Sequence, residues 1–181
     1  AMATATLVNK GKVIEPRIVT GISGPTGYQN TAAKIRTGID DVSEEHWNTI
    51  LTAMYDTVHA DDGTARSAFA GAVYDSGGKT GTAQLFSLGE DEEYEEEKVA
   101  ERKRDNAMYV GFAPYENPSI VIVVAAENAG GGAANAAPIA REMMDLYFGL
   151  GNAHRDNIAP LPKLPPVLNE VATEESNSGE D

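Results

Sequence analysis

Apolar residues recur every three or four positions between residues 43 and 59, which is the spacing of one face of an α-helix. Ser43 can cap the first turn, and Glu44 and Glu45 lie where the helix dipole favours negative charge. An Asp61-Asp62-Gly63 turn follows. The pattern therefore predicts a helix over 43–59, whose apolar face consists of Trp47, Ile50, Leu51, Met54, Tyr55 and Val58.

Three later segments, 79–87, 106–115 and 119–127, have the pattern of strands. The last reads Ile-Val-Ile-Val-Val-Ala-Ala after its first residue, and such a run is typical of a strand covered on both faces. Glu116-Asn117-Pro118 predicts a turn that joins the second and third strands into an antiparallel hairpin. We therefore predict an α/β (α+β) fold, in which an antiparallel three-stranded sheet is flanked by helices.

Weaker patterns complete this arrangement. Residues 1–9 have the pattern of the last turns of a helix, and a final helix is predicted over 138–148, with a proline near its start. We also predict a strand over 12–20, a turn-rich loop over 21–30 and a short helix over 64–70.

The formal net charge of -14 argues against nucleic acid or an anionic membrane as a direct partner. Much of this charge lies in two acidic runs, 90–97 and 170–181, which we interpret as solvated segments. The first run belongs to a charged, helix-prone excursion over 90–104. Because proline, acid and small polar residues dominate from residue 155 onward, we predict a folded portion over 1–154 and a disordered tail over 155–181.

Metal and redox chemistry find no support in the composition. The chain has no cysteine, and His46, His59 and His154 are scattered without the spacing of metal ligands. We therefore expect no metal site and no cofactor.

The segment Lys79-Thr80-Gly81-Thr82 carries the most informative chemistry. In an extended chain, Lys79 and Gly81 share one face, while Thr80 and Thr82 share the other. Gly81 allows another group to approach the backbone closely. A cation and two hydroxyls can hold a carboxylate, and a backbone N–H can stabilise a developing oxyanion.

A phosphate-binding loop is the alternative from another class of protein. Gly78-Lys79-Thr80 satisfies the end of the G-x-x-x-x-G-K-[ST] pattern, but the first glycine would have to be residue 73, which is Val73. That motif also opens a helix, whereas the residues after Gly81 have the pattern of a strand. We therefore reject this alternative.

The Lys-Thr-Gly triplet is one of three motifs of penicillin-binding proteins and serine β-lactamases. The other two, Ser-x-x-Lys with the nucleophile and a Ser-x-Asn-type motif, are expected earlier in the chain. We interpret none of the serines before Lys79 as the nucleophile, namely Ser23, Ser43, Ser67 and Ser76. We therefore expect one wall of an active site without its nucleophile.

Over roughly residues 2 to 149, the chain resembles the C-terminal part of the transpeptidase domain of elongation-type class B penicillin-binding proteins, the penicillin-binding protein 2 family. The matching segments occur in the family's order and at family-like spacing. They are 7–16, 53–55, 62–65, 79–88, 104–106, 112–118 and 127–131. The resemblance implies part of a serine β-lactamase-like, penicillin-binding transpeptidase fold.

The resemblance also implies site roles. Lys79, Thr80, Gly81 and Thr82 would line the site for the carboxylate of a D-alanyl-D-alanine stem peptide or of a β-lactam. The N–H of Thr82 would be one oxyanion-hole donor, and the N–H of the missing serine would be the other. The parent protein would cross-link peptidoglycan at the periplasmic face of the inner membrane, held by an N-terminal anchor absent from this chain. Its partners would be the N-terminal part of the same domain and membrane proteins of the elongation machinery.

We expect the isolated chain to be inactive and to expose an apolar edge at strand 119–127, which favours association. Two alternatives stay open. One is a non-enzymatic fragment that binds a partner. The other keeps the fold but changes the reaction to that of a D,D-carboxypeptidase or a β-lactamase-like hydrolase.

Overall fold

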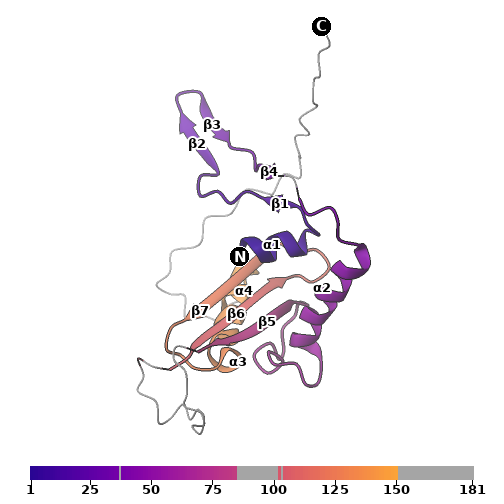
Figure 1. Cartoon of the computed structure of the whole chain (residues 1–181). Helices are drawn as coiled ribbons and strands as arrows, with labels where there is room; N and C mark the ends of the chain where they lie inside the picture. Colours follow the sequence, from indigo (N-terminus) through magenta and orange to yellow (C-terminus); the bar gives the residue numbers. More distant parts are fainter. Residues whose placement is uncertain (37, 85–101, 103, 151–181) are drawn as a thin grey trace. The chain divides into compact units, whose positions relative to one another are not determined.

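A three-stranded antiparallel sheet forms the centre of the fold in a computed structural model, which describes residues 1–36, 38–84, 102 and 104–150 (Figure 1). Its strands are β5 (Gly77–Ala83), β6 (Asn106–Ala113) and β7 (Ile120–Ala126), in the order β5-β6-β7. The predicted antiparallel sheet is confirmed. Since β6 pairs with both neighbours, β5 and β7 are the edges of the sheet as described.

The register of the sheet assigns each side chain to one of two faces. Thr80 lies opposite Tyr109, which lies opposite Val124, so these three share a face. Tyr109 and Val124 belong to the buried core, together with Ile122, Ala107, Ala140 and Met144. The other face carries Lys79, Val110 and Val123, of which Val123 is 43% exposed.

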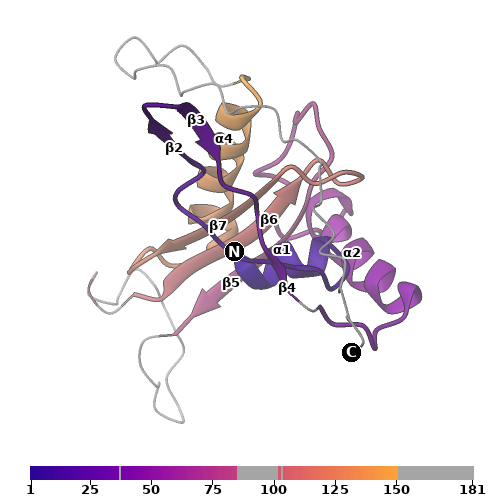
Figure 2. The same ribbon diagram turned by 90° about the horizontal axis from the view of Figure 1, so that it is seen from above.

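Two helices pack against these faces. The face with Tyr109 is covered by α4 (Ala137–Tyr147), and α1 (Met2–Val8) lies on the opposite side of the sheet (Figure 2). A short helix, α3 (Gly132–Asn135), precedes α4. The predicted helices near the two ends of the described chain are therefore present, each within a residue or two of its expected bounds.

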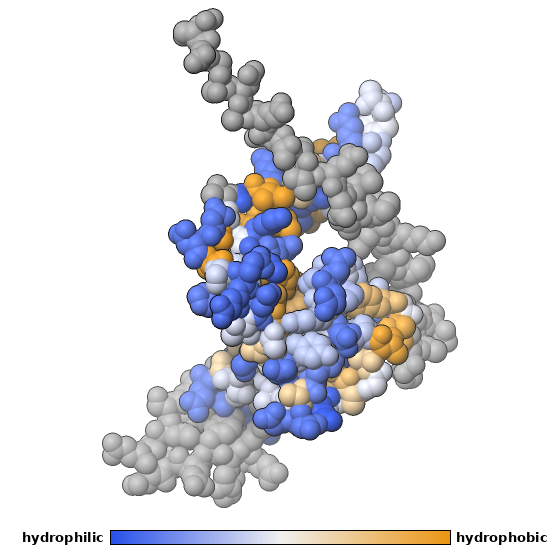
Figure 3. Space-filling model, turned by 90° about the vertical axis from the view of Figure 1, so that its right-hand side faces the viewer, coloured by the Kyte–Doolittle hydropathy of each residue, from blue (hydrophilic) through white to orange (hydrophobic). Residues whose placement is uncertain are grey.

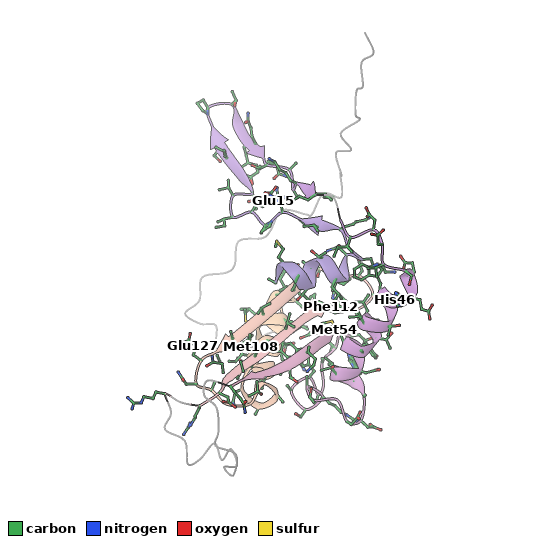
Figure 4. All side chains as sticks on the ribbon, in the orientation of Figure 1. Glu15, His46, Met54, Met108, Phe112 and Glu127 are labelled. Carbon is green, nitrogen blue, oxygen red and sulfur yellow. The ribbon has the colours of Figure 1, made fainter. Side chains whose placement is uncertain are left out.

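The longest helix, α2 (Glu44–His59), confirms the predicted helix, and Trp47 and Val58 of its predicted apolar face are buried, whereas Ile50 of that face is 44% exposed. Its N-cap is Ser43, whose hydroxyl accepts a 3.3 Å hydrogen bond from the His46 N–H. Met54 and Phe112 lie next to one another where α2 meets the sheet, and a Cβ built on Gly77 would contact both (Figure 4). On the α2 side of the molecule, hydrophilic residues cover most of the described surface (Figure 3).

The segment before α2 differs from the prediction. β1 (Val13–Ile14) pairs with β4 (Ile35–Arg36), so the first strand ends well before residue 20. Pro16 has no N–H to donate to a ladder, which explains this early end. The predicted loop over 21–30 is instead a hairpin of β2 (Gly21–Gly24) and β3 (Gly27–Asn30), whose tight turn uses Gly27 at a φ of +103°.

The predicted short helix over 64–70 is also wrong, because this segment is a series of turns. The Arg66, Ala70 and Ala72 N–H groups donate to carbonyls three residues earlier, as in turns, and the Ala65 N–H donates to the Thr57 carbonyl of α2 at 2.9 Å. The segment therefore folds back onto the end of α2. The segment ends at Gly71, whose φ of +74° is a backbone conformation that glycine adopts readily.

The start of β5 also differs from the prediction, because the strand begins at Gly77 and not at Lys79. A Cβ on Gly77 would lie 2.7 Å from the Phe112 ring, and one on Gly78 would lie 2.0 Å from the Tyr109 hydroxyl. These glycines thus make room for two aromatic rings of β6. The predicted tail, and the excursion over 90–104 except for Arg102 and Arg104, lie outside the described residues. Within the described part, no helix is long and apolar enough to cross a bilayer.

Candidate functional site

The segment Lys79-Thr80-Gly81-Thr82 lies in β5, at an edge of the described sheet. β6 pairs with one side of this strand, and no other described strand pairs with its second side. Edge strands present unpaired N–H and C=O groups to their surroundings. The segment therefore has the backbone position that a ligand-binding edge requires.

The direction of the peptide groups along β5 follows from the close approach of Gly132. A Cβ built on Gly132 would lie 2.1 Å from the Gly81 oxygen and 2.4 Å from the Met108 oxygen. Gly81 and Met108 lie opposite each other, so both carbonyls lie between the strands, as in a hydrogen-bonded pair. Because such pairs alternate along an antiparallel ladder, Thr80 and Thr82 direct their N–H and C=O groups away from β6, toward the free edge.

The hydroxyls of Thr80 and Thr82 are held by two different parts of the chain. Thr80 Oγ1 lies 2.8 Å from Thr64 Oγ1, in the turns that follow α2. Thr82 Oγ1 accepts a 3.4 Å hydrogen bond from the N–H of Gly132, at the start of α3. Both hydroxyls thus lie on the face of β5 that Tyr109 shares.

Lys79 supplies the cation of the segment. Its side chain is exposed, and Nζ donates a 2.6 Å hydrogen bond to the Thr80 carbonyl. That carbonyl is one of the groups directed at the free edge, so the ammonium lies at the same edge. The arrangement brings together one positive charge, two hydroxyls and outward peptide groups, a set that suits an anionic ligand.

Lys79 follows Ser76 by three residues, so these two residues have the spacing of Ser-x-x-Lys. Ser76 is thus the one serine before Lys79 with this spacing, although we predicted that none of these serines is the nucleophile. Side chains three residues apart meet on a helix but point to opposite faces of an extended strand. Ser76 is fully buried, and its backbone N–H and C=O lie 3.3 and 3.1 Å from His59 Nε2. It therefore does not form a nucleophile pair with the exposed Lys79.

Two residues near the segment were not predicted to act there. Thr64 was only part of the family-like segment 62–65, and Gly132 directly follows the last such segment, 127–131. The structure brings them to β5 from 16 and 50 residues away in the sequence. No local pattern indicates such contacts, although a glycine run beside a compact helix is consistent with close backbone packing.

Other candidate sites in the described residues are weaker than the segment in β5. A shallow hollow lies on one surface of α2 and includes none of the residues of the segment in β5; it is lined by Glu45, Asn48, Thr49, Thr52, Ala53 and Asp56. In the same part of the chain, no group of three His, Cys, Asp or Glu residues could hold a metal ion.

The amino-acid sequence is similar to those of known proteins. A sequence model described as the penicillin binding protein transpeptidase domain matches residues 1–145. A peptidoglycan D,D-transpeptidase MrdA of Haemophilus influenzae is 42% identical over 148 residues, which are 82% of this chain and 23% of that protein. The Escherichia coli K12 protein of the same name is 35% identical over 130 residues, covering 72% of this chain and 20% of its own length.

The chain is also similar to a solved structure. The crystal structure of Pseudomonas aeruginosa PBP2 in complex with WCK 5153 aligns at a TM-score of 0.64 and 33% identity, covering 80% of this chain and 28% of that one. The chain thus spans about a quarter of the length of the relatives it matches. On this sequence and structural agreement, the chain belongs to the penicillin-binding protein transpeptidase domain family, among relatives of the PBP2 type.

Proposed function

We propose that this chain supplies the Lys-Thr-Gly wall of a peptidoglycan D,D-transpeptidase. The observation that carries the proposal is the edge strand β5, which directs Lys79 Nζ and the peptide groups of Thr80 and Thr82 to its free edge and carries two threonine hydroxyls on one face. The H. influenzae and E. coli relatives are named for this activity.

In the proposed reaction, Lys79, Thr80 and Thr82 hold the terminal carboxylate of a D-alanyl-D-alanine stem peptide. A serine from a part of the transpeptidase outside this chain attacks the penultimate carbonyl. The Thr82 N–H then donates to the oxyanion that forms, and one such donor contributes about 3 kcal/mol to transition-state stabilisation. The peptide C–N bond then breaks, the serine proton passes to the leaving nitrogen, and D-alanine departs. The amine of a second stem peptide attacks the acyl-serine, the ester C–O bond breaks, and the proton of the amine returns to the serine oxygen.

A β-lactam carries a carboxylate beside a strained amide, so it would occupy the same edge and acylate the same serine. The remaining expectations rest on family membership alone. We propose that the parent protein acts at the periplasmic face of the inner membrane, where its substrate lies, and that the rest of the same domain is its first partner. The expected elongation-machinery partner stays a prediction.

Labelling with a fluorescent penicillin tests the proposal. The samples are the chain by itself, the H. influenzae relative, and a chimera of that relative in which this chain replaces the aligned segment. Adducts are read by gel fluorescence and intact mass. We expect the relative and the chimera to gain one adduct and the chain to gain none, because the nucleophile lies outside it.

Each other outcome identifies what is wrong. A labelled chain would show that one of its own serines is the nucleophile. A folded chimera that stays unlabelled beside a labelled relative would show that this chain does not supply a working wall. Release of D-alanine from a stem peptide without transfer to an amine would favour the D,D-carboxypeptidase alternative.

A further inference from the structure

A contact between two hydroxyls links the turns after α2 to the candidate site. Thr64 Oγ1 and Thr80 Oγ1 lie 2.8 Å apart, a normal distance for an O–H···O hydrogen bond. Thr64 lies outside the Lys-Thr-Gly triplet and is exposed, so this hydroxyl is not needed to fill the core. Its contact with the triplet therefore calls for another explanation.

Both neighbours of Thr64 are fixed against the end of α2. Ala65 is fully buried, and its N–H donates to the Thr57 carbonyl at 2.9 Å. The Gly63 N–H donates to the Ala60 carbonyl at 3.0 Å, and a Cβ on Gly63 would lie 2.6 Å from the Asp56 oxygen. The backbone therefore holds the Thr64 hydroxyl in one place relative to α2.

The chemistry of a hydroxyl pair allows two arrangements. Each threonine hydroxyl has one proton and two lone pairs, so only one of the two can donate across the 2.8 Å contact. If Thr80 donates to Thr64, the Thr80 proton is turned away from a ligand. If Thr64 donates, the Thr80 proton is free to point at a ligand, and the shared bond polarises Thr80 as a donor.

We propose that Thr64 is a positioning residue for carboxylate recognition. The Thr64 hydroxyl donates a hydrogen bond to Thr80 Oγ1, and the Thr80 hydroxyl then donates a hydrogen bond to a carboxylate at the free edge of β5. The inference rests on the proposed function. It adds that the turns after α2 contribute to the selection of an anionic substrate.

The test compares two probes that differ in one charge, a penicillin with its free carboxylate and the methyl ester of the same penicillin. Acylation rates are measured for the H. influenzae chimera as wild type and as Thr64→Val, which keeps the shape but removes the hydroxyl. Thr64→Ser restores the hydroxyl. The melting temperature of each variant reports any loss of folding.

We expect Thr64→Val to lower the acylation rate for the free acid by about three- to tenfold, the effect of one hydrogen bond. The rate for the ester should stay close to that of the wild type, and Thr64→Ser should recover most of the preference for the acid. This pattern would not arise from a general loosening of the fold.

Two results would overturn the inference while the proposed function stands. One is an unchanged ratio of the acid and ester rates in Thr64→Val, and the other is an equal loss for both probes. An unlabelled wild-type chimera beside a labelled relative would overturn the proposed function first, and the role of Thr64 would fall with it.

Discussion

Gly132 lies so close to the candidate site that its missing side chain is part of the site's construction. It approaches Gly81 and Met108 across the peptide groups that join β5 to β6, and its N–H reaches Thr82 Oγ1. The position of the Thr82 hydroxyl thus depends on a backbone contact as well as on its place in the strand.

Gly132→Ala should therefore lower the free energy of unfolding. The new Cβ would lie 2.1 Å from the Gly81 oxygen, so α3 or β5 has to move, and overpacking of this kind costs about 1–3 kcal/mol. Urea unfolding of the chain measures the loss. Gly131→Ala is the matched control, because a Cβ there meets nothing within 4 Å and its φ is -74°. Equal stability of the two variants would contradict the packing argument.

The residues of the candidate site could be predicted only in part. The order of Lys79, Thr80, Gly81 and Thr82 gives their chemistry and their alternation along a strand. It does not give the bond to Thr64 or the approach of Gly132, since these depend on how distant parts of the chain pack. The spacing of Ser76 and Lys79 shows the converse, because a motif spacing has its chemical meaning only on the right element.

Among the elements, α4 holds the loop that leads into β5. The Tyr74 hydroxyl donates to Asp145 Oδ1 at 2.8 Å, and Arg141 Nε donates to both oxygens of that carboxylate at 2.8 and 2.9 Å. The ring of Phe148 packs on Tyr74 with 4.8 Å between centroids. A helix far along the sequence thus fixes the entry to the strand that carries the site.

This junction predicts a loss of stability at alkaline pH. Burial, followed by the hydrogen bond to Asp145 and its charge, raises the pKa of Tyr74 well above its usual value in the folded chain. The contribution of Tyr74 to the free energy of unfolding is fully present below its unfolded-state pKa of about 10, and it is lost as the pH rises from there toward the folded-state pKa. Tyr74→Phe cannot ionise, so its free energy of unfolding should fall less than that of the wild type between about pH 9 and pH 11.

Urea unfolding across that pH range gives the comparison, with Tyr28→Phe in the exposed hairpin as the control. Burial also raises the pKa of Tyr109, so some alkaline loss should persist in Tyr74→Phe. Identical pH profiles for Tyr74→Phe and the wild type would show that the phenol of Tyr74 does not couple folding to pH.

The elements with strong periodicity were the ones that could be predicted. α2, β6 and β7 contain apolar residues at helical or strand-like spacing, so their order and approximate bounds follow from the sequence. β5, Gly-Gly-Lys-Thr-Gly-Thr-Ala, has no such pattern, and its start was predicted two residues too late. The hairpin of β2 and β3 has no alternating pattern in Gly-Ile-Ser-Gly-Pro-Thr-Gly-Tyr-Gln-Asn, and its strand pairing becomes visible only in the folded chain. The turns over 64–70 depend on bonds to α2, which local propensity does not contain.

In the sheet as a whole, the two edges of the described fold differ in character. Lys79 and two threonines lie along β5, and a charge on an edge strand discourages pairing with another chain. β7 (Ile120–Ala126) contains no charged residue. Apolar side chains near it are partly exposed to solvent, namely Val123 of β7 at 43% and Met108 of β6 at 40%. Association of the chain should therefore use the β7 edge.

We expect the purified chain to self-associate as its concentration rises, and sedimentation velocity over a concentration series measures this. Val123→Lys places a charge on the partly open face of β7, so it should shift the chain toward monomer without a large loss of stability. Val73→Lys, at a residue that is 78% exposed and outside the sheet, is the control and should leave association unchanged. A wild-type chain that stays monomeric at every concentration would show that the β7 edge does not recruit a second copy.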